Sequence, residues 1–170
     1  MKPRYQDMHP ELQVKYLAFA GKMAERGLPF GLSCVLRLEI EQQALYAQGR
    51  EPVEAVNARR MLAGMTWLVD IMSRTEPGVI VKSAEAQNVI VTHTKISRHF
   101  PDKNGKSRAF DIQVLGNGGR PTWDLKFDGD QDGIGDYMEA AEIGKSCGLD
   151  CGAFWPGFRD YPHMQLPDKV

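Results

Sequence analysis

The order of two hydrophobic patterns along the chain is the feature that most constrains its fold. Apolar residues recur at steps of three and four after Pro10 and again over 54–73, as in amphipathic helices. After Pro77 the pattern changes to short alternating or β-branched runs, which are typical of strands. Because helices come mostly first and strands later, without regular βαβ alternation, we predict an α+β fold.

The end of each expected element is marked by turn residues. Gly27 and Gly148 are good helix stops, and Glu76-Pro77-Gly78 ends the long helical pattern. A turn-rich loop occupies 101–106. The expected helices cover 10–26, 39–48, 54–73 and 137–146, and the expected strands cover 30–36, 79–81, 89–92, 109–114 and 162–166.

The composition excludes several classes of protein. The chain has 170 residues, 42% of them hydrophobic, and its longest apolar run, 61–69, is too short to cross a bilayer. The Lys and Arg residues are dispersed, so we expect no nucleic-acid partner. The three cysteines do not suggest a disulfide framework, and the first seven residues lack the hydrophobic core of a signal peptide. We expect a monomeric single domain, 1–170, made in the cytoplasm and not inserted into a membrane.

Two predicted strands present metal-binding groups opposite an apolar face. Alternation places His163 and Gln165 on one face of the last strand, and it separates Asp111 from the apolar residues on either side of it. His99, Asp111 and His163 together would make a set of two histidines and one carboxylate. Three protein ligands and one open position are typical of catalytic zinc, which lowers the pKa of its bound water. From spacing alone, isolated surface or core histidines are the alternative.

Several segments resemble a known family when they are taken together. These segments are Ser97-Arg98-His99, Ser107 to Ile112, Trp155 to Gln165, and the stretch Glu41 to Arg50 (EQQALYAQGR). In this order they resemble the zinc D-Ala-D-Ala carboxypeptidase / L-alanoyl-D-glutamate endopeptidase family (peptidase M15), which includes many phage endolysins. The resemblance runs from about Pro10 to Leu166. It implies a small antiparallel sheet flanked by helices, a Hedgehog/DD-peptidase-like arrangement.

The resemblance also implies roles for individual residues. His99, Asp111 and His163 become the zinc ligands, and Asp160 becomes the general base. Arg37 matches the family arginine that stabilises the developing oxyanion. Taken alone, Asp160 could equally be a turn-forming residue. We further expect Ser97 and Trp155 to contact the substrate, although Trp155 could instead fill the core.

Three departures from the family pattern are visible in the sequence. His99 and Asp111 are twelve residues apart where seven are common, so we predict a loop insertion around Asp102 to Lys106. The residues on either side of Arg37 lack the usual aromatic residue and serine. The helix expected at about 54–73 is also an insertion relative to compact family members. His93 is a competing histidine to which the family pattern gives no metal role.

An acidic segment stands out within a nearly neutral chain. Residues 124–142 contain seven acidic residues and one lysine, and 128–139 match the calcium-loop pattern D-x-D-x-D-G-x5-E without a mismatch. Gly133 would make the sharp turn. The alternative is a solvated acidic loop. The expected oxygen ligands are Asp128, Asp130, Asp132, the Ile134 carbonyl, Asp136 and Glu139.

From these observations we predict a Zn²⁺ metallopeptidase that hydrolyses a peptide bond in bacterial peptidoglycan stem peptides. The bond implied by the resemblance is L-alanoyl-D-glutamate, and the implied role is that of a phage or prophage endolysin that acts on the wall after release. Two alternatives stay open at this point. One is a D-Ala-D-Ala carboxypeptidase or dipeptidase, and the other is a non-catalytic calcium- or wall-binding module of the same fold.

Overall fold

The structure is a computed structural model that describes residues 2–65 and 88–168. The chain divides into two compact units. Unit 1 comprises Met1–Leu36 with Arg98–Val170, and unit 2 comprises Arg37–Ser97. The single catalytic domain expected from the sequence stays a prediction.

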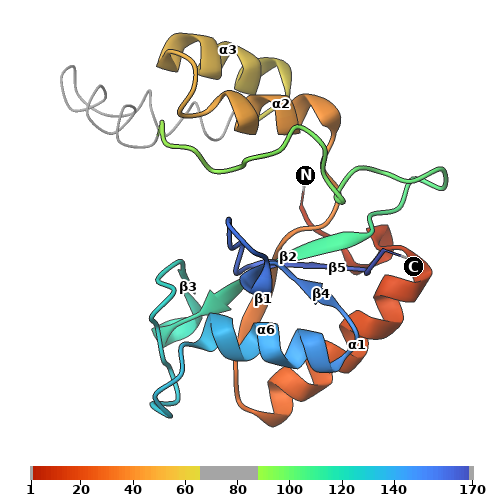
Figure 1. The fold of residues 1–170 in the computed structure, drawn as a ribbon, viewed down its shortest axis with the longest axis vertical. Coiled ribbons are helices and arrows are strands. Elements are labelled where there is room, and N and C mark those ends of the chain that lie inside the picture. The colour runs from red at the N-terminus through yellow and green to blue at the C-terminus, as the bar shows by residue number, and fades with distance from the viewer. Residues whose placement is uncertain (1, 66–87, 169–170) are drawn as a thin grey trace. The chain divides into compact units, whose positions relative to one another are not determined.

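Unit 1 contains the sheet and two of the helices (Figure 1). Short 3₁₀ turns lie at Tyr5–Asp7, Asn117–Gly119 and Gly152–Phe154. The main elements are α1 (Pro10–Glu25), β1 (Phe30–Cys34), β2 (Ala109–Leu115), β3 (Pro121–Thr122), α6 (Asp136–Ser146), β4 (Asp150–Cys151) and β5 (His163–Gln165).

The strands form one antiparallel sheet in the order β1-β2-β5-β4, with β3 also paired to β2. Asp111 in the central strand β2 lies directly opposite Cys34 on β1 and His163 on β5. Residues that are directly opposite in an antiparallel pair point to the same face. The predicted α+β class, with helices beside a small antiparallel sheet, is confirmed.

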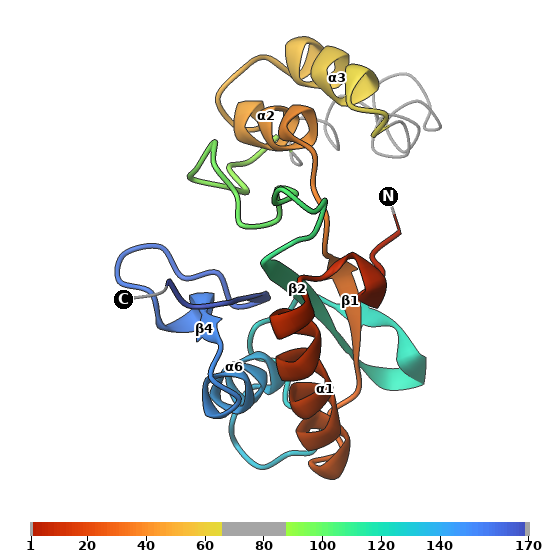
Figure 2. The same cartoon turned by 90° about the vertical axis from the view of Figure 1, so that its right-hand side faces the viewer.

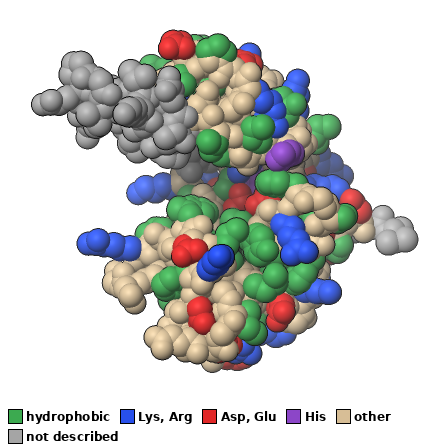
Figure 3. Space-filling model, turned by 60° about the vertical axis from the view of Figure 1, so that its left-hand side comes forward, with side chains coloured by type: hydrophobic (Ala, Val, Ile, Leu, Met, Phe, Trp, Pro, Cys, Tyr) green, Lys and Arg blue, Asp and Glu red, His purple; other side chains and the backbone are tan. Residues whose placement is uncertain are grey.

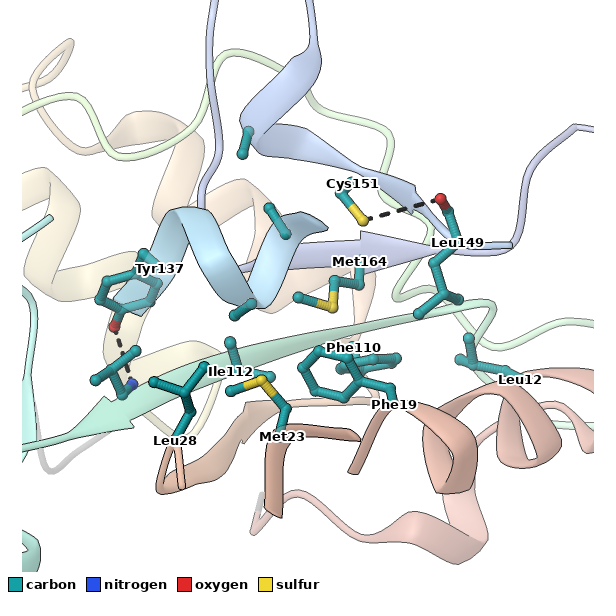
Figure 4. Packing of buried hydrophobic residues seen from close by; sticks show 14 of the residues in the cluster. Leu12, Phe19, Met23, Leu28, Phe110, Ile112, Tyr137, Leu149, Cys151 and Met164 are labelled. Atoms are coloured by element: carbon teal, nitrogen blue, oxygen red, sulfur yellow. Dashed lines mark hydrogen bonds between the residues drawn. The ribbon is translucent and has the colours of Figure 1, made fainter. Parts of the chain in front are cut away.

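One face of the sheet packs against α1 and α6 and forms the hydrophobic core. Phe110 and Ile112 of β2 and Met164 of β5 are fully buried there (Figure 4). Helix α1 contributes Phe19, and α6 contributes Tyr137, whose hydroxyl accepts a hydrogen bond from the Val114 N–H. Figure 2 shows α1 and α6 next to each other beside the sheet. The opposite face of β2 and β5 is therefore left for polar side chains.

The ends of α1 follow from its sequence. His9 caps the helix by accepting a hydrogen bond from the Glu11 N–H, and Pro10 occupies the first turn, where no intrahelical donor is needed. After the last turn Gly27 adopts a φ of 71°, a left-handed conformation that glycine tolerates. The predicted boundaries of this helix are confirmed to within a residue or two.

Unit 2 contains α2 (Glu39–Ala47) and α3 (Val53–Leu62). The single helix expected over 54–73 is wrong in its described part, because α3 ends at Leu62 and Gly64 takes a φ of 70°. The rest of that helix and the strand expected at 79–81 lie outside the described residues. The strand expected at 89–92 is also wrong: this segment is irregular, and Val89, Ile90 and Val91 are exposed.

Two surface properties bear on the predicted partners. Within the described residues, no helix combines the length and the apolar character that crossing a bilayer requires. On the face drawn in Figure 3, Lys and Arg side chains are scattered among other residues and do not form a continuous stripe.

Candidate metal centre

Three side chains from separate segments meet on the polar face of the sheet in unit 1. Asp111 Oδ1 lies 3.0 Å from His99 Nε2 and 2.9 Å from His163 Nδ1. The two histidine nitrogens are 3.2 Å apart. His99 and His163 are buried, with 1% and 7% of their surface exposed. The structure therefore brings together the three residues predicted as zinc ligands.

Each imidazole is oriented by a hydrogen bond from its other ring nitrogen. His99 Nδ1 donates to the Val35 carbonyl oxygen at 2.8 Å. His163 Nε2 donates to Gln165 Oε1 at 3.0 Å. A carbonyl oxygen can only accept, so these partners fix a proton on His99 Nδ1 and on His163 Nε2, and the other nitrogens, His99 Nε2 and His163 Nδ1, face the centre.

The hydrogen bond at His163 continues into a short network. Gln165 Nε2 donates to Asp150 Oδ2 at 2.8 Å, and Trp155 Nε1 donates to Asp150 Oδ1, also at 2.8 Å. The Trp155 ring lies against the His163 ring, with the centroids 5.1 Å apart. Asp150 thus fixes both the glutamine and the indole that contact His163. Sequence reasoning missed Asp150, because it lies in a strand of two residues, which is too short to leave a pattern in the sequence.

The close approach of these groups shifts their protonation. Burial by itself lowers the pKa of His99, but the neighbouring Asp111 carboxylate outweighs it and raises the pKa of His99 to about 10. Burial likewise raises the pKa of the Asp111 carboxyl, but the charge on His99 and the hydrogen bonds from both histidines hold it well below its ordinary range. The anionic carboxylate therefore needs a positive partner, which is a proton on a histidine or a bound cation.

The donor set fits a zinc ion. Zinc binds imidazole nitrogen and carboxylate oxygen at about 2.0–2.2 Å, so neighbouring ligand atoms of a tetrahedral site lie about 3.3 Å apart. The three distances among His99, Asp111 and His163 are close to this value. Hydrogen bonds to the outer nitrogens of ligating histidines are a regular feature of zinc sites. His99, Asp111 and His163 would thus hold the metal through three ligands.

The sequence around the site explains how it is positioned. Asp111 points away from the core because Phe110 and Ile112 on either side are buried against the helices. The extra residues between His99 and β2 form a tight turn, in which Asp102 Oδ1 accepts hydrogen bonds from the Asn104 and Lys106 N–H groups. The predicted loop insertion therefore returns the chain to β2 without disturbing the ligands.

A third potential ligand type lies beside the site and was missed by sequence reasoning. Cys34 Sγ and ligand atoms of His99 and Asp111 all lie within 4.8 Å of one another. A hydrogen bond from His99 to Cys34 is one of the influences that raise the pKa of His99. The other two cysteines, Cys147 and Cys151, are free thiols. The signal for Cys34 was its place near the end of the strand that pairs with Asp111.

Asp160 lies on the short segment that leads into β5. Its N–H donates to the Gly152 carbonyl at 3.0 Å, and its own carbonyl accepts the His163 N–H at 3.1 Å. The backbone of Asp160 is therefore fixed on both sides, directly before a predicted zinc ligand. Its role as general base stays a prediction.

Arg37 and Ser97 belong to unit 2, whereas His99, Asp111 and His163 belong to unit 1. Arg37 Nη1 donates to Gln42 Oε1 at 2.9 Å, and Gln42 Nε2 donates to the Thr94 carbonyl at 2.7 Å. Ser97 is half-buried. The stretch that resembles the family thus organises unit 2 around the buried Gln42. The oxyanion role of Arg37 and the substrate contact of Ser97 stay predictions.

The acidic segment forms a second group of potential ligands in unit 1. Carboxylate oxygens of Asp128, Asp130 and Asp136 lie within 4.8 Å of one another. The same is true of Asp130, Asp132 and Glu139. The five side chains predicted for calcium are therefore gathered around Asp130, while Ile134, expected to contribute its carbonyl, lies on the same loop with its side chain exposed.

Comparison with known proteins supplies a relative that matches most of the chain. The chain is 26% identical over 160 residues to the peptidoglycan L-alanyl-D-glutamate endopeptidase CwlK of Bacillus subtilis (strain 168). The match covers 94% of this chain and 74% of that protein. The predicted family resemblance is confirmed. No family model matches the chain.

A solved structure that is similar to the chain belongs to an enzyme with the same named activity as CwlK. It is the L-Ala D-Glu endopeptidase ChiX of Serratia marcescens. The sequences are 18% identical, the TM-score is 0.49, and the match covers 96% of this chain and 83% of that chain.

Proposed function

We propose that the protein is a zinc-dependent endopeptidase that cleaves the L-alanoyl-D-glutamate bond of peptidoglycan stem peptides. The observation that supports this most strongly is the convergence of His99 Nε2, Asp111 Oδ1 and His163 Nδ1 within 2.9–3.2 Å. Isolated core histidines would not need to converge on one carboxylate oxygen. The relative CwlK is named for this activity, and its similarity extends over nearly the whole chain.

Different residues of the chain carry out proton transfer, stabilisation of the oxyanion and substrate binding. When bound, zinc supplies a Lewis acid that polarises the scissile carbonyl and activates water. The carboxylate of Asp160 takes a proton from the attacking water and delivers it to the leaving amine. The guanidinium of Arg37 holds the oxygen of the scissile carbonyl as it becomes negative. Trp155 lines the site next to His163, and Ser97 contributes to substrate binding.

The proposal extends to the biological setting. The substrate is part of the bacterial cell wall, so the enzyme acts there, and we propose that it serves as a phage or prophage endolysin acting as a monomer. Lysis of permeabilised bacteria by the purified protein tests this part. We expect lysis to depend on zinc. A cell suspension whose turbidity does not fall after prolonged incubation would argue against a lytic role.

Mass spectrometry of digested peptidoglycan tests which bond is cleaved. The endopeptidase should release peptides that begin with D-glutamate and leave L-alanine on the glycan strand. Release of free D-alanine alone would show a carboxypeptidase instead, and no released product would show a binding module. His163→Ala should release nothing. Asp160→Asn should retain the metal and lose most of the activity, about 10²–10⁴-fold for a general acid–base residue.

A further inference from the structure

Residues 128–139 comprise the end of the loop after β3 and the first turn of α6, and we call this segment the acidic loop. Gly133 adopts a φ of 93°, and its N–H donates to Asp128 Oδ2 at 2.9 Å. The Asp132 N–H donates to Asp128 Oδ1 at 3.2 Å, and the Ile134 N–H donates to Asp132 Oδ1 at 2.8 Å. The backbone thus folds inward around its own carboxylates, in the order of a calcium-binding loop.

The negative charges of the acidic loop are not balanced within it. Five carboxylates gather around Asp130, in two overlapping groups whose oxygens lie within 4.8 Å. Arg26, the residue that follows α1, pairs with two of these carboxylates. It forms an ion pair with Glu139 Oε1 and lies 3.9 Å from Asp132 Oδ2. One guanidinium offsets only part of this charge.

Glu139 gives an independent indication of a missing ligand. Its side chain is 2% exposed, although it sits in the first turn of a helix beside an exposed loop. Arg26 binds Oε1, but the second oxygen, Oε2, is buried and has no hydrogen-bond partner. A buried carboxylate oxygen without a partner is rare, because its lost hydration is not replaced. Oε2 belongs to the residue that a calcium loop uses as its bidentate ligand.

The surroundings of the buried acids agree with an uncompensated negative charge. Burial raises the pKa of Asp136, and Asp130 and Asp128 raise it further. Burial also raises the pKa of Glu139, Arg26 lowers it, and Asp132 and Asp130 raise it. A divalent cation at this position would counteract the increase in the pKa of both carboxyl groups.

We propose that the acidic loop binds one Ca²⁺ ion and that this ion competes with Arg26 for the carboxylate of Glu139. The ligands are all oxygens, which suit a hard cation such as calcium and distinguish this site from the nitrogen-rich zinc centre. Bidentate binding by Glu139 uses Oε2 and takes Oε1 from Arg26. The remaining ligands are Asp128, Asp130, Asp132, the Ile134 carbonyl and Asp136.

Binding at the acidic loop would stabilise the part of unit 1 that supports β5. Glu139 lies at the start of α6, and α6 contacts β4 and the Gly152–Phe154 turn. The packing there is tight, because a Cβ placed at Gly144 of α6 would lie 2.8 Å from Cys151 Sγ. Calcium should therefore raise the melting temperature of the whole unit, independently of peptidase activity.

Calorimetric titration of the metal-depleted full chain with CaCl₂, combined with thermal unfolding, tests the proposal. One calcium per chain and a higher melting temperature are expected. Glu139→Gln should weaken binding by about tenfold or more. Asp130→Asn should also weaken calcium binding, and it leaves the core unaffected because the Asp130 side chain is exposed. Glu142→Gln, an exposed change of equal charge on α6, is the matched control and should bind like the wild type.

Arg26→Gln separates competition from simple charge attraction. Removal of the competing guanidinium should tighten calcium binding, because Glu139 Oε1 is then available. Unchanged or weaker binding would overturn the competition. The calcium site itself would be overturned if CaCl₂ produced no binding heat and no thermal shift, or if Asp130→Asn bound as tightly as Glu142→Gln. Equal affinity for MgCl₂ would also overturn it, since that result indicates charge screening.

Discussion

Gly152 and Asp160 approach each other so closely that no side chain fits between them. A Cβ atom placed at Gly152 would lie 2.3 Å from the Asp160 carbonyl oxygen and 3.0 Å from its Cβ. The same pair is joined by the hydrogen bond from the Asp160 N–H to the Gly152 carbonyl. The glycine therefore sets where the proposed general base can lie.

Gly152→Ala should displace Asp160 and lower kcat for peptidoglycan hydrolysis by about 100-fold, since a shift of about 1 Å at a catalytic group is that costly. Zinc stoichiometry should be unchanged. The matched control is Gly21→Ala in α1, where a Cβ meets nothing within 4 Å. A Gly152→Ala enzyme with wild-type kcat would contradict the role given to Asp160.

Gln165→Met should weaken zinc binding by about 10–100-fold, because the hydrogen bond that orients the His163 ring is lost. The measurement is a competition titration with a zinc-binding dye. Gln113→Met on β2 makes the same chemical change outside this network and is expected to leave the affinity unchanged. Equal loss in both variants would mean that Gln165 acts only through packing.

The metal-free protein should lose stability as the pH rises from about 6.5 to about 10. The pKa of His99 is raised by folding from 6.5 to about 10, so the stabilisation by its protonated form is complete below the unfolded pKa. It disappears as the pH approaches the folded pKa. Urea midpoints of the metal-free chain across this range measure the effect, and Asp111→Asn should flatten the profile. A midpoint that is constant from pH 6.5 to 9 in the wild type would contradict the His99–Asp111 pairing.

Phe110→Ala should lower the free energy of unfolding by about 3–5 kcal/mol, because it removes a fully buried ring from the contact between the sheet and α1. Leu17→Ala on the exposed side of α1 is the control, with an expected change within about 0.5 kcal/mol. Urea unfolding measures both. Similar losses in the two variants would be inconsistent with the core described for unit 1.

The sequence predicted those parts of the fold that have long, regular patterns. The periodicity after Pro10 and the alternation around Asp111 are confirmed, because each reflects a face buried against the core. The strand predicted for the β-branched run 89–92 was wrong, because β propensity reflects packing of side chains on a sheet, whereas Val89, Ile90 and Val91 are exposed. Strands of two residues, such as β4, are too short for any pattern.

The candidate site was predictable only in part, for a physical reason. The alternation that separates His163 and Gln165 from the core face is local and visible in the sequence, and the two side chains do bond to each other. The groups that orient the site come from elsewhere in the chain. Val35 acts through its backbone carbonyl, which has no residue signature, and Asp150 meets Gln165 only because β4 pairs with β5.

Zinc titration of the metal-free chain tests most directly whether His99, Asp111 and His163 form a metal centre. The wild type should bind one zinc ion per chain tightly. Asp111→Asn and His163→Ala should each remove that site, while the exposed change Glu142→Gln retains it. Zinc binding by Asp111→Asn and His163→Ala with the stoichiometry and affinity of the wild type would contradict the account.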